Sequence, residues 1–159
     1  MKILKIQALR GPNLWSVQRK KLIQMRLDLE EMEQFPTNKI EGFRERIEAM
    51  FPTMIEHRCS EGCRGGFFSR VERGTWMGHV IEHIALEIQT LAGMETGFGR
   101  TRETKTPGIY NVVFSYTEEN VGLFAAESAG RIAEALIAGT DYDLVGDIQK
   151  MREIRERVR

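Results

Sequence analysis

The sequence has few cysteines, no excess charge of either sign and no long apolar run. Each of these shortages excludes a class of protein. Two cysteines in 159 residues do not make a disulfide framework, so we expect a reducing, cytoplasmic setting. Lys plus Arg and Asp plus Glu number 23 each, and a formal net charge of zero argues against a dedicated nucleic-acid binder. No apolar stretch approaches the length of a membrane span, and lysines interrupt the first residues too early for a secretion signal.

The length and the pattern of apolar residues predict one α+β domain over residues 1–159. Expected strands cover residues 2–10, 22–30 and 109–116, and expected helices cover 43–50, 76–91, 118–138 and 143–159. This order is not a βαβ alternation, so we expect a small, largely antiparallel sheet packed with about four helices. The glycine-rich residues 58–74 and the polar residues 95–108 are expected to be loops, and the alternative for the first is a loop that contains a short element at Phe67-Phe68. The last helix, 143–159, has no stop signal and is expected to lead toward a linker.

Three ionisable residues on the second expected helix form a metal-hydrolase pattern. His79, Glu82 and His83 stand at positions i, i+3 and i+4, which share one helix face. The order H-x-x-E-H is that of inverted zinc peptidases. Two neutral imidazoles one turn apart supply nitrogen ligands to Zn²⁺, and Glu82 is expected to carry the proton from water to the leaving amine. The alternative is a polar helix stripe with hydrogen-bonded histidines and a solvated glutamate.

A catalytic zinc ion usually has a third protein ligand and one open position. We expect Glu127, set among small residues on the next helix, to be that ligand. Glu87, one turn beyond His83, is the other candidate. Cys59 and Cys63, with His57 nearby, have the spacing of a separate structural zinc site, but a fourth ligand is missing, so free thiols are favoured.

Arg100 and Arg102 follow the metal helix in a glycine-rich segment. Alternate residues of an extended segment point the same way, so the two guanidiniums are expected to meet a carboxylate of the substrate. The alternative is a solvated basic loop.

Several segments together resemble the amino-terminal domain of cyanophycin synthetases, over nearly all of the chain. The most distinctive are Gly74-Thr75-Trp76-Met77-Gly78-His79 and Gly99-Arg100-Thr101-Arg102-Glu103-Thr104. Ala8-Leu9-Arg10-Gly11-Pro12-Asn13, Met25-Arg26-Leu27-Asp28-Leu29-Glu30, Glu82-His83-Ile84-Ala85-Leu86-Glu87 and Tyr110-Asn111-Val112-Val113 add to the resemblance.

The resemblance implies a domain that holds cyanophycin, a polymer with an aspartate backbone and arginine on each side chain. It also implies that ATP-grasp and Mur-ligase-like domains follow in a cytoplasmic, bacterial, homo-oligomeric full-length enzyme. The 159 residues contain no Gly-x-x-x-x-Gly-Lys-Ser/Thr phosphate loop, so we expect no ATP to bind this fragment.

Two functions remain open at this point. The first is zinc-dependent hydrolysis inside the polymer, which would generate primers for polymerisation. The second is a non-catalytic module that anchors cyanophycin for the ligase domains, with purely structural docking as a simpler alternative.

Overall fold

A computed structural model describes residues 1–11, 13–15 and 20–158. Pro12 and Arg159, which belong to the segments discussed above, lie outside these ranges. The described residues form one four-stranded antiparallel sheet in the order β1-β2-β4-β3. The strands are β1 (Lys2–Leu9), β2 (Leu22–Asp28), β3 (Gly99–Glu103) and β4 (Ile109–Ser115). The helices are α1 (Phe43–Met50), α2 (Gly66–Arg73), α3 (Met77–Leu91), α4 (Glu119–Ala138) and α5 (Leu144–Val158).

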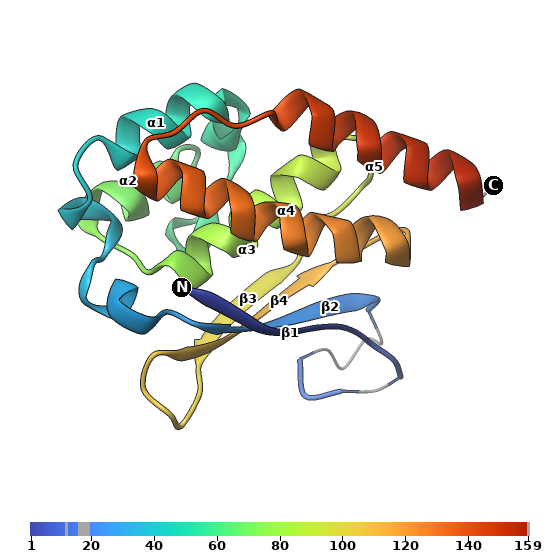
Figure 1. Cartoon of the computed structure of the whole chain (residues 1–159), viewed down its shortest axis with the longest axis horizontal. Helices are drawn as coiled ribbons and strands as arrows, with labels where there is room; N and C mark the ends of the chain where they lie inside the picture. Colours follow the sequence, from blue (N-terminus) through green and yellow to red (C-terminus); the bar gives the residue numbers. More distant parts are fainter. Residues whose placement is uncertain (12, 16–19, 159) are drawn as a thin grey trace.

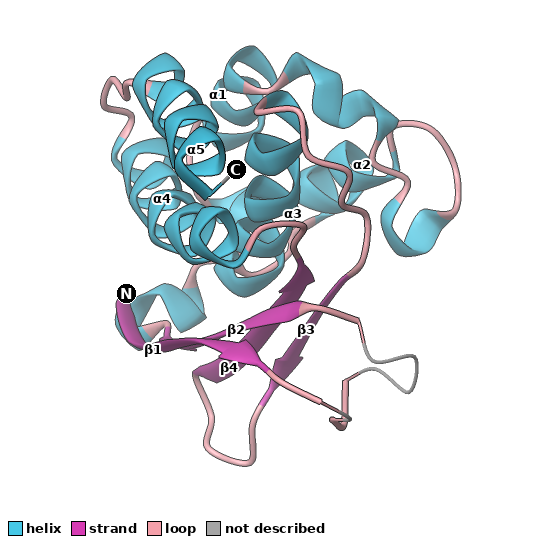
Figure 2. Cartoon of the chain, turned by 90° about the vertical axis from the view of Figure 1, so that its right-hand side faces the viewer, coloured by secondary structure: helices cyan, strands magenta, loops and turns pink. Residues whose placement is uncertain are grey.

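All five helices lie on one face of the sheet (Figures 1 and 2), which confirms the α+β prediction. Helix α3 packs over β3 and β4, and α4 packs over β1 and β2. The strands alternate as a half-covered sheet should. Ile23, Met25 and Leu27 of β2 point into the core and are fully buried, whereas Gln24 and Arg26 point to the other face.

Helices α3 and α4 pack against each other, and α4 buries many small residues in the core. Ala125, Ala126 and Ala129 are fully buried, and Ser128 is buried with them. Small side chains allow the two backbones to approach closely, so the small-residue segment of α4 builds the core. Glu127 is the exposed residue in this segment.

Two segments that the sequence predicts as loops contain regular structure. Within residues 95–108, Gly99–Glu103 is the edge strand β3, paired with β4. Within residues 58–74, Gly66–Arg73 is helix α2, which buries Phe67, Phe68 and Val71. Both elements are short and border the candidate site.

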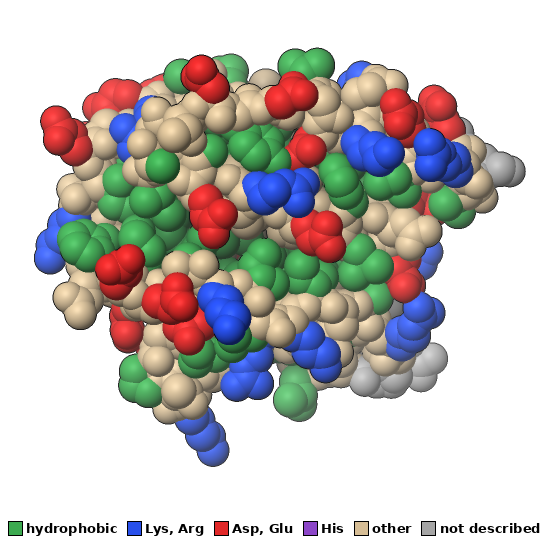
Figure 3. All heavy atoms as spheres, in the orientation of Figure 1, with side chains coloured by type: hydrophobic (Ala, Val, Ile, Leu, Met, Phe, Trp, Pro, Cys, Tyr) green, Lys and Arg blue, Asp and Glu red, His purple; other side chains and the backbone are tan. Residues whose placement is uncertain are grey.

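No helix in the described ranges is long and apolar enough to cross a membrane. The face formed by α1, α4 and α5 shows acidic and basic side chains interspersed with apolar ones, without a large area of one sign (Figure 3). This mixture agrees with the zero net charge.

Candidate metal centre

The three motif residues of α3 face a cavity of about 730 Å³ between α3, α2, β3 and the segment around residue 58. His79, Glu82 and His83 all line it, as the i, i+3, i+4 spacing predicts. Burial is deep: Glu82 and His83 are each 7% exposed, and His79 is partly buried. Burying three ionisable side chains is costly unless each has a partner, so their contacts decide what the site does.

Cys59 completes a cluster with the two histidines. One ligand atom each from Cys59, His79 and His83 lies within 4.8 Å of the others. The Cys59 Sγ is 3.1 Å from the His79 Nε2. Cys59 holds a left-handed backbone conformation, with φ of 53°, which a residue with a side chain rarely adopts. The turn that brings the thiol to the helix therefore carries a backbone cost.

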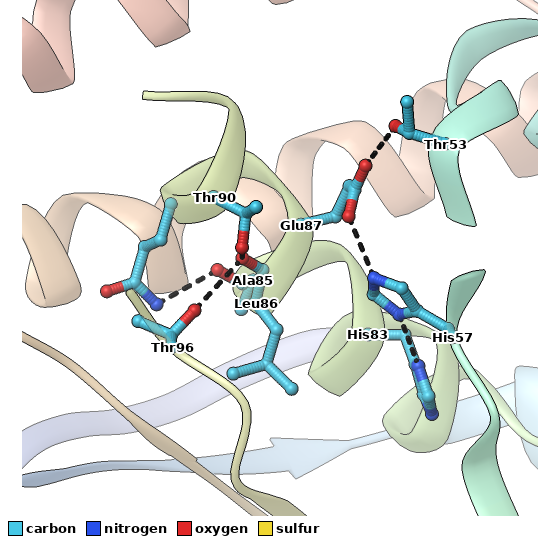
Figure 4. A network of polar contacts seen from close by, with 9 residues as sticks. Thr53, His57, His83, Ala85, Leu86, Glu87, Thr90 and Thr96 are labelled. Atoms are coloured by element: carbon cyan, nitrogen blue, oxygen red, sulfur yellow. Dashed lines mark hydrogen bonds and ion pairs between the residues drawn. The ribbon is translucent and has the colours of Figure 1, made fainter. Parts of the chain in front are cut away.

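A chain of hydrogen bonds runs from His83 away from the cluster (Figure 4). The His83 Nδ1 lies 2.8 Å from the Nδ1 of His57, and the His57 Nε2 lies 2.8 Å from a carboxylate oxygen of Glu87. Thr53 donates to the other oxygen of Glu87. Since the Glu87 carboxylate accepts from the His57 Nε2–H, the His57 Nδ1 accepts from the His83 Nδ1–H. The His83 Nε2 then keeps its lone pair.

His79 is oriented in the same way by a different partner. Its Nδ1 lies 2.9 Å from the Thr75 hydroxyl, which leaves the Nε2 facing Cys59. Phe67 of α2 fixes both rings: it stacks on His83 at 4.2 Å and meets His79 at 5.9 Å, centroid to centroid. The His83 ring thus presents its Nε2 with a free lone pair, and the His79 ring turns its Nε2 toward the Cys59 Sγ. Outer partners of this kind orient metal-binding histidines.

The electrostatics of the cluster keep the imidazoles neutral. Burial and then the positive charge of Arg70 lower the pKa of His79 to about 4. Burial, with the neighbouring histidines His79 and His57, lowers the pKa of His83 well below its usual value. Burial alone would raise the pKa of Glu87, but the hydrogen bonds from His57 and Thr53 outweigh it and lower that pKa. Neutral imidazoles at neutral pH are the form that binds metals.

Glu82 lies beside the cluster in a space made by β3. The Thr101 hydroxyl donates to its Oε2 at 2.6 Å, and burial raises the pKa of Glu82 to about 7. Gly99 leaves room for this carboxylate, because a Cβ at Gly99 would lie 2.5 Å from the Glu82 Oε1. The edge strand therefore positions the carboxylate that the motif supplies.

These residues fit a zinc ion by the chemistry of their donors. Thiolate sulfur and imidazole nitrogen are both ordinary zinc ligands, and a catalytic zinc ion has three protein ligands with a fourth position left open. The open side here is the cavity, where Glu82 lies.

The structure does not bring the predicted third ligand, Glu127, to the histidines. Glu127 lies on α4, is exposed, and neither lines the cavity nor joins the cluster within the described ranges. The neighbouring small residues of α4 bury themselves against α3, so Glu127 points away. Glu87 accepts from His57, and it is Cys59 that lies together with the two histidines. Cys63 is exposed and does not join this cluster.

Arg100 and Arg102 share a face, as predicted, but it is the outer face of the sheet. Thr101 between them points inward to Glu82, so strand alternation turns the two arginines outward. Arg102 lies over the ring of Trp15 at 5.9 Å, and Arg100 lies 5.7 Å from the ring of Phe98. Arg100 is also among the residues that line the cavity.

Sequence reasoning missed the supporting residues His57, Thr75, Thr101 and Arg70 in this role. His57 and Cys59 stood out as a pair with metal-binding chemistry, but their distance in sequence from the α3 motif hid the connection. Thr75, one helical turn before His79, is the supporting residue that spacing alone offers a reason to select.

Fold and site together define an α+β domain with a candidate Cys-His-His metal centre and an adjacent carboxylate. A family model described as the cyanophycin synthase-like N-terminal domain matches residues 24–138. The chain therefore belongs to this family, as the resemblance of its motifs predicted.

Curated relatives extend the match over almost the whole chain. A cyanophycin synthetase of Synechocystis sp. is 53% identical over 156 residues, 98% of this chain and 18% of the relative. One from Geminocystis herdmanii is 54% identical over 158 residues, with the same two shares. The chain thus spans about a fifth of the length of these relatives.

Proposed function

We propose that this domain is a zinc-dependent amidohydrolase that cuts cyanophycin internally and so makes primers for polymerisation. The observation that carries the proposal is the meeting of Cys59, His79 and His83 beside the Glu82 carboxylate in one cavity. A set of metal ligands without a nearby group that can carry a proton would suit a structural metal ion. A carboxylate at the open side suits hydrolysis.

Each residue has a separate task in this proposal. A bound zinc ion supplies Lewis-acid polarisation of the scissile amide and favours ionisation of water. Glu82 takes the proton from the attacking water and passes it to the leaving nitrogen. Glu82 suits both transfers because its carboxylate lines the same cavity as the Cys59, His79 and His83 cluster, within reach of a water bound there. Thr101 holds one carboxylate oxygen, so the other remains available.

The family supplies the substrate of the proposal. The relatives are named cyanophycin synthetases, and the chain spans 18% of them. Polymer synthesis by ATP-grasp and Mur-ligase-like domains in a cytoplasmic homo-oligomer is accordingly proposed for the longer protein. A hydrolytic domain in that chain would create the new chain ends that the synthetic sites extend.

The test is release of soluble fragments from purified cyanophycin by the zinc-loaded chain. We expect a chelator and the Glu82→Gln substitution each to abolish release, with melting unchanged for Glu82→Gln in the zinc-loaded protein. Release that persists in Glu82→Gln removes Glu82 from the mechanism. No release from a folded, zinc-loaded chain contradicts the hydrolase.

Measurements of zinc affinity decide whether Cys59 or Glu127 is the third ligand of the proposed zinc site. Cys59→Ala should weaken zinc binding by more than the roughly 10- to 100-fold typical of outer partners. Cys63→Ala and Glu127→Gln should leave it unchanged, because both residues lie outside the cluster. Weakening by Glu127→Gln alone would restore the ligand expected from the sequence.

A binding module is the second candidate function, favoured by the outer face of the sheet. Lys5, Arg26, Asn111 and Arg102 form one row across the four strands by direct pairing. The three cations of this row are exposed and form no ion pair with any described residue. Like charges directly opposite each other on neighbouring strands destabilise a sheet, as Lys5 and Arg26 do here. An anionic ligand bound to this row would offset that repulsion. Arg100 and Arg102 keep a substrate-binding role in this proposal.

A further inference from the structure

Arg70 is a cation in the cavity that forms no ion pair or hydrogen bond with any residue in the described ranges. It lies on α2, one helical turn after Phe67, and residues three apart share a helix face. Phe67 stacks on His83, so this face of α2 is turned toward the metal cluster. Arg70 lines the cavity together with His79, and its charge is one cause of the lowered pKa of His79.

The guanidinium of Arg70 is partly buried and unsatisfied. Its Nε is buried without a hydrogen-bond partner, and no described residue forms an ion pair with it. The next arginine of the helix, Arg73, shows the contrast: it pairs with Glu61 and does not line the cavity. A partly desolvated cation without a counter-charge is costly in the free protein, and an anion that enters the cavity would offset that cost.

A metal ion does not explain this position of Arg70, because a cation beside a dication site is repelled. The group that suits Arg70 is an anion bound next to the reacting amide. A planar guanidinium pairs with a carboxylate through two parallel hydrogen bonds, which also fixes orientation.

We propose that Arg70 binds a carboxylate of the substrate beside the metal cluster and so sets which amide is cut. The inference rests on the proposed function and names its substrate class, a polyamide with a free carboxylate close to the scissile bond. In cyanophycin each arginine side group offers such a carboxylate. Arg70 is thus a specificity residue, separate from the proton transfer by Glu82.

The test compares two substrates that differ only in this group. One is a short soluble cyanophycin chain with free arginine carboxylates, and the other is the same chain with those carboxylates converted to amides. For each, kcat/KM is measured with the zinc-loaded chain, and Kd is measured in the zinc-loaded Glu82→Gln background, where binding is read without turnover. The variants are Arg70→Gln, Arg70→Lys and, as the matched control on the same helix, Arg73→Gln.

We expect Arg70→Gln to weaken binding of the carboxylate substrate by about 10- to 100-fold, the range for charge-assisted hydrogen bonds. Binding of the amide substrate should change little. On the carboxylate substrate, the affinity of Arg70→Lys should lie between those of the unsubstituted protein and Arg70→Gln, because lysine keeps the charge and loses the paired geometry. Arg73→Gln should match the unsubstituted protein.

Equal losses on both substrates would make Arg70 structural and overturn the inference, as would unchanged binding in Arg70→Gln. The two proposals fail separately. If neither substrate is cut yet the Arg70-dependent preference persists in binding, the hydrolase is wrong and the carboxylate site stands. If both are cut without any effect of Arg70→Gln, only the carboxylate site is wrong.

Discussion

At the scale of single residues, the site contains two groups, Glu82 and His79, whose contributions to folding stability change with pH in opposite directions. Burial raises the pKa of Glu82 from 4.5 to about 7, so the folded state favours its protonated form. Glu82 therefore contributes stability below pH 4.5 that is lost as the pH rises through 7. Burial and Arg70 lower the pKa of His79 from 6.5 to about 4, so its contribution is present above pH 6.5 and is lost as the pH falls through 4.

The Glu82→Gln substitution should remove the pH-dependent contribution of Glu82 from the stability of the metal-free protein. We expect the unfolding free energy of this variant, relative to the unsubstituted chain, to rise between pH 4.5 and about 8, past the raised pKa. The rise is at most about 3.5 kcal/mol, since the shift from 4.5 to about 7 corresponds to about 1.4 kcal/mol per pKa unit. Urea unfolding with a chelator present measures it. Glu127→Gln, at an exposed position, should follow the unsubstituted chain. A constant difference would mean that Glu82 ionises as freely in the fold as in the unfolded chain.

Helical spacing predicted two of the three residues of the cluster, and the Glu82 carboxylate beside it. His79, Glu82 and His83 were found because helical spacing places them on one face regardless of the rest of the fold. Cys59 was not assigned to them, because its approach depends on a left-handed turn and on how the segment before α2 folds back. Contacts between distant segments leave no period in the sequence.

At the scale of elements, the strongly periodic segments were predicted and the short polar ones were not. Strands β1, β2 and β4 and helices α1, α3, α4 and α5 follow from apolar spacing. Strand β3 is an edge strand whose inward side meets Glu82 and Gly78 instead of an apolar core, so it lacks the alternation of a buried strand. Helix α2 begins among glycines, which favour a loop when read alone.

The missed strand β3 gives a prediction of its own. Gly99→Ala should displace the Glu82 carboxylate, because the added Cβ would come within 2.5–2.7 Å of three of its atoms. We expect cyanophycin cleavage to fall by at least about 10-fold, in line with the loss of a positioned proton carrier, while zinc affinity is kept. Gly97→Ala is the matched control, since a Cβ there meets nothing within 4 Å. If both variants cleave equally well, Gly99 is not what positions the Glu82 carboxylate.

At the scale of the whole molecule, the sheet separates two chemistries. Its inner face carries the core and the candidate metal centre, and its outer face carries amides and cations. Gln7 donates to Gln24 at 2.8 Å, and Gln24 donates to Asn111 at 3.4 Å, so a ladder of amides crosses three strands. The cations Lys5, Arg26 and Arg102 stand beside this ladder. A polymer held on the outer face would pass the edge strand β3 to reach the cavity, and Arg100 both lies on that strand and lines the cavity.

Holding and cutting should therefore be separable by substitution. Arg26→Ala and Arg102→Ala should each weaken retention of cyanophycin by about two- to five-fold, as expected for an exposed charge contact of about 0.5–1 kcal/mol. Their combination should also make retention less sensitive to salt, since fewer screened contacts remain. Lys150→Ala on α5 removes the same charge from another face and should have no effect. The measurement is co-sedimentation of the unsubstituted chain and the four variants with the insoluble polymer across a salt series. If Lys150→Ala weakens retention as much as the outer-face variants do, retention depends on net charge alone. If only the outer-face variants weaken retention, and retention survives a chelator, the polymer binds the outer face of the sheet.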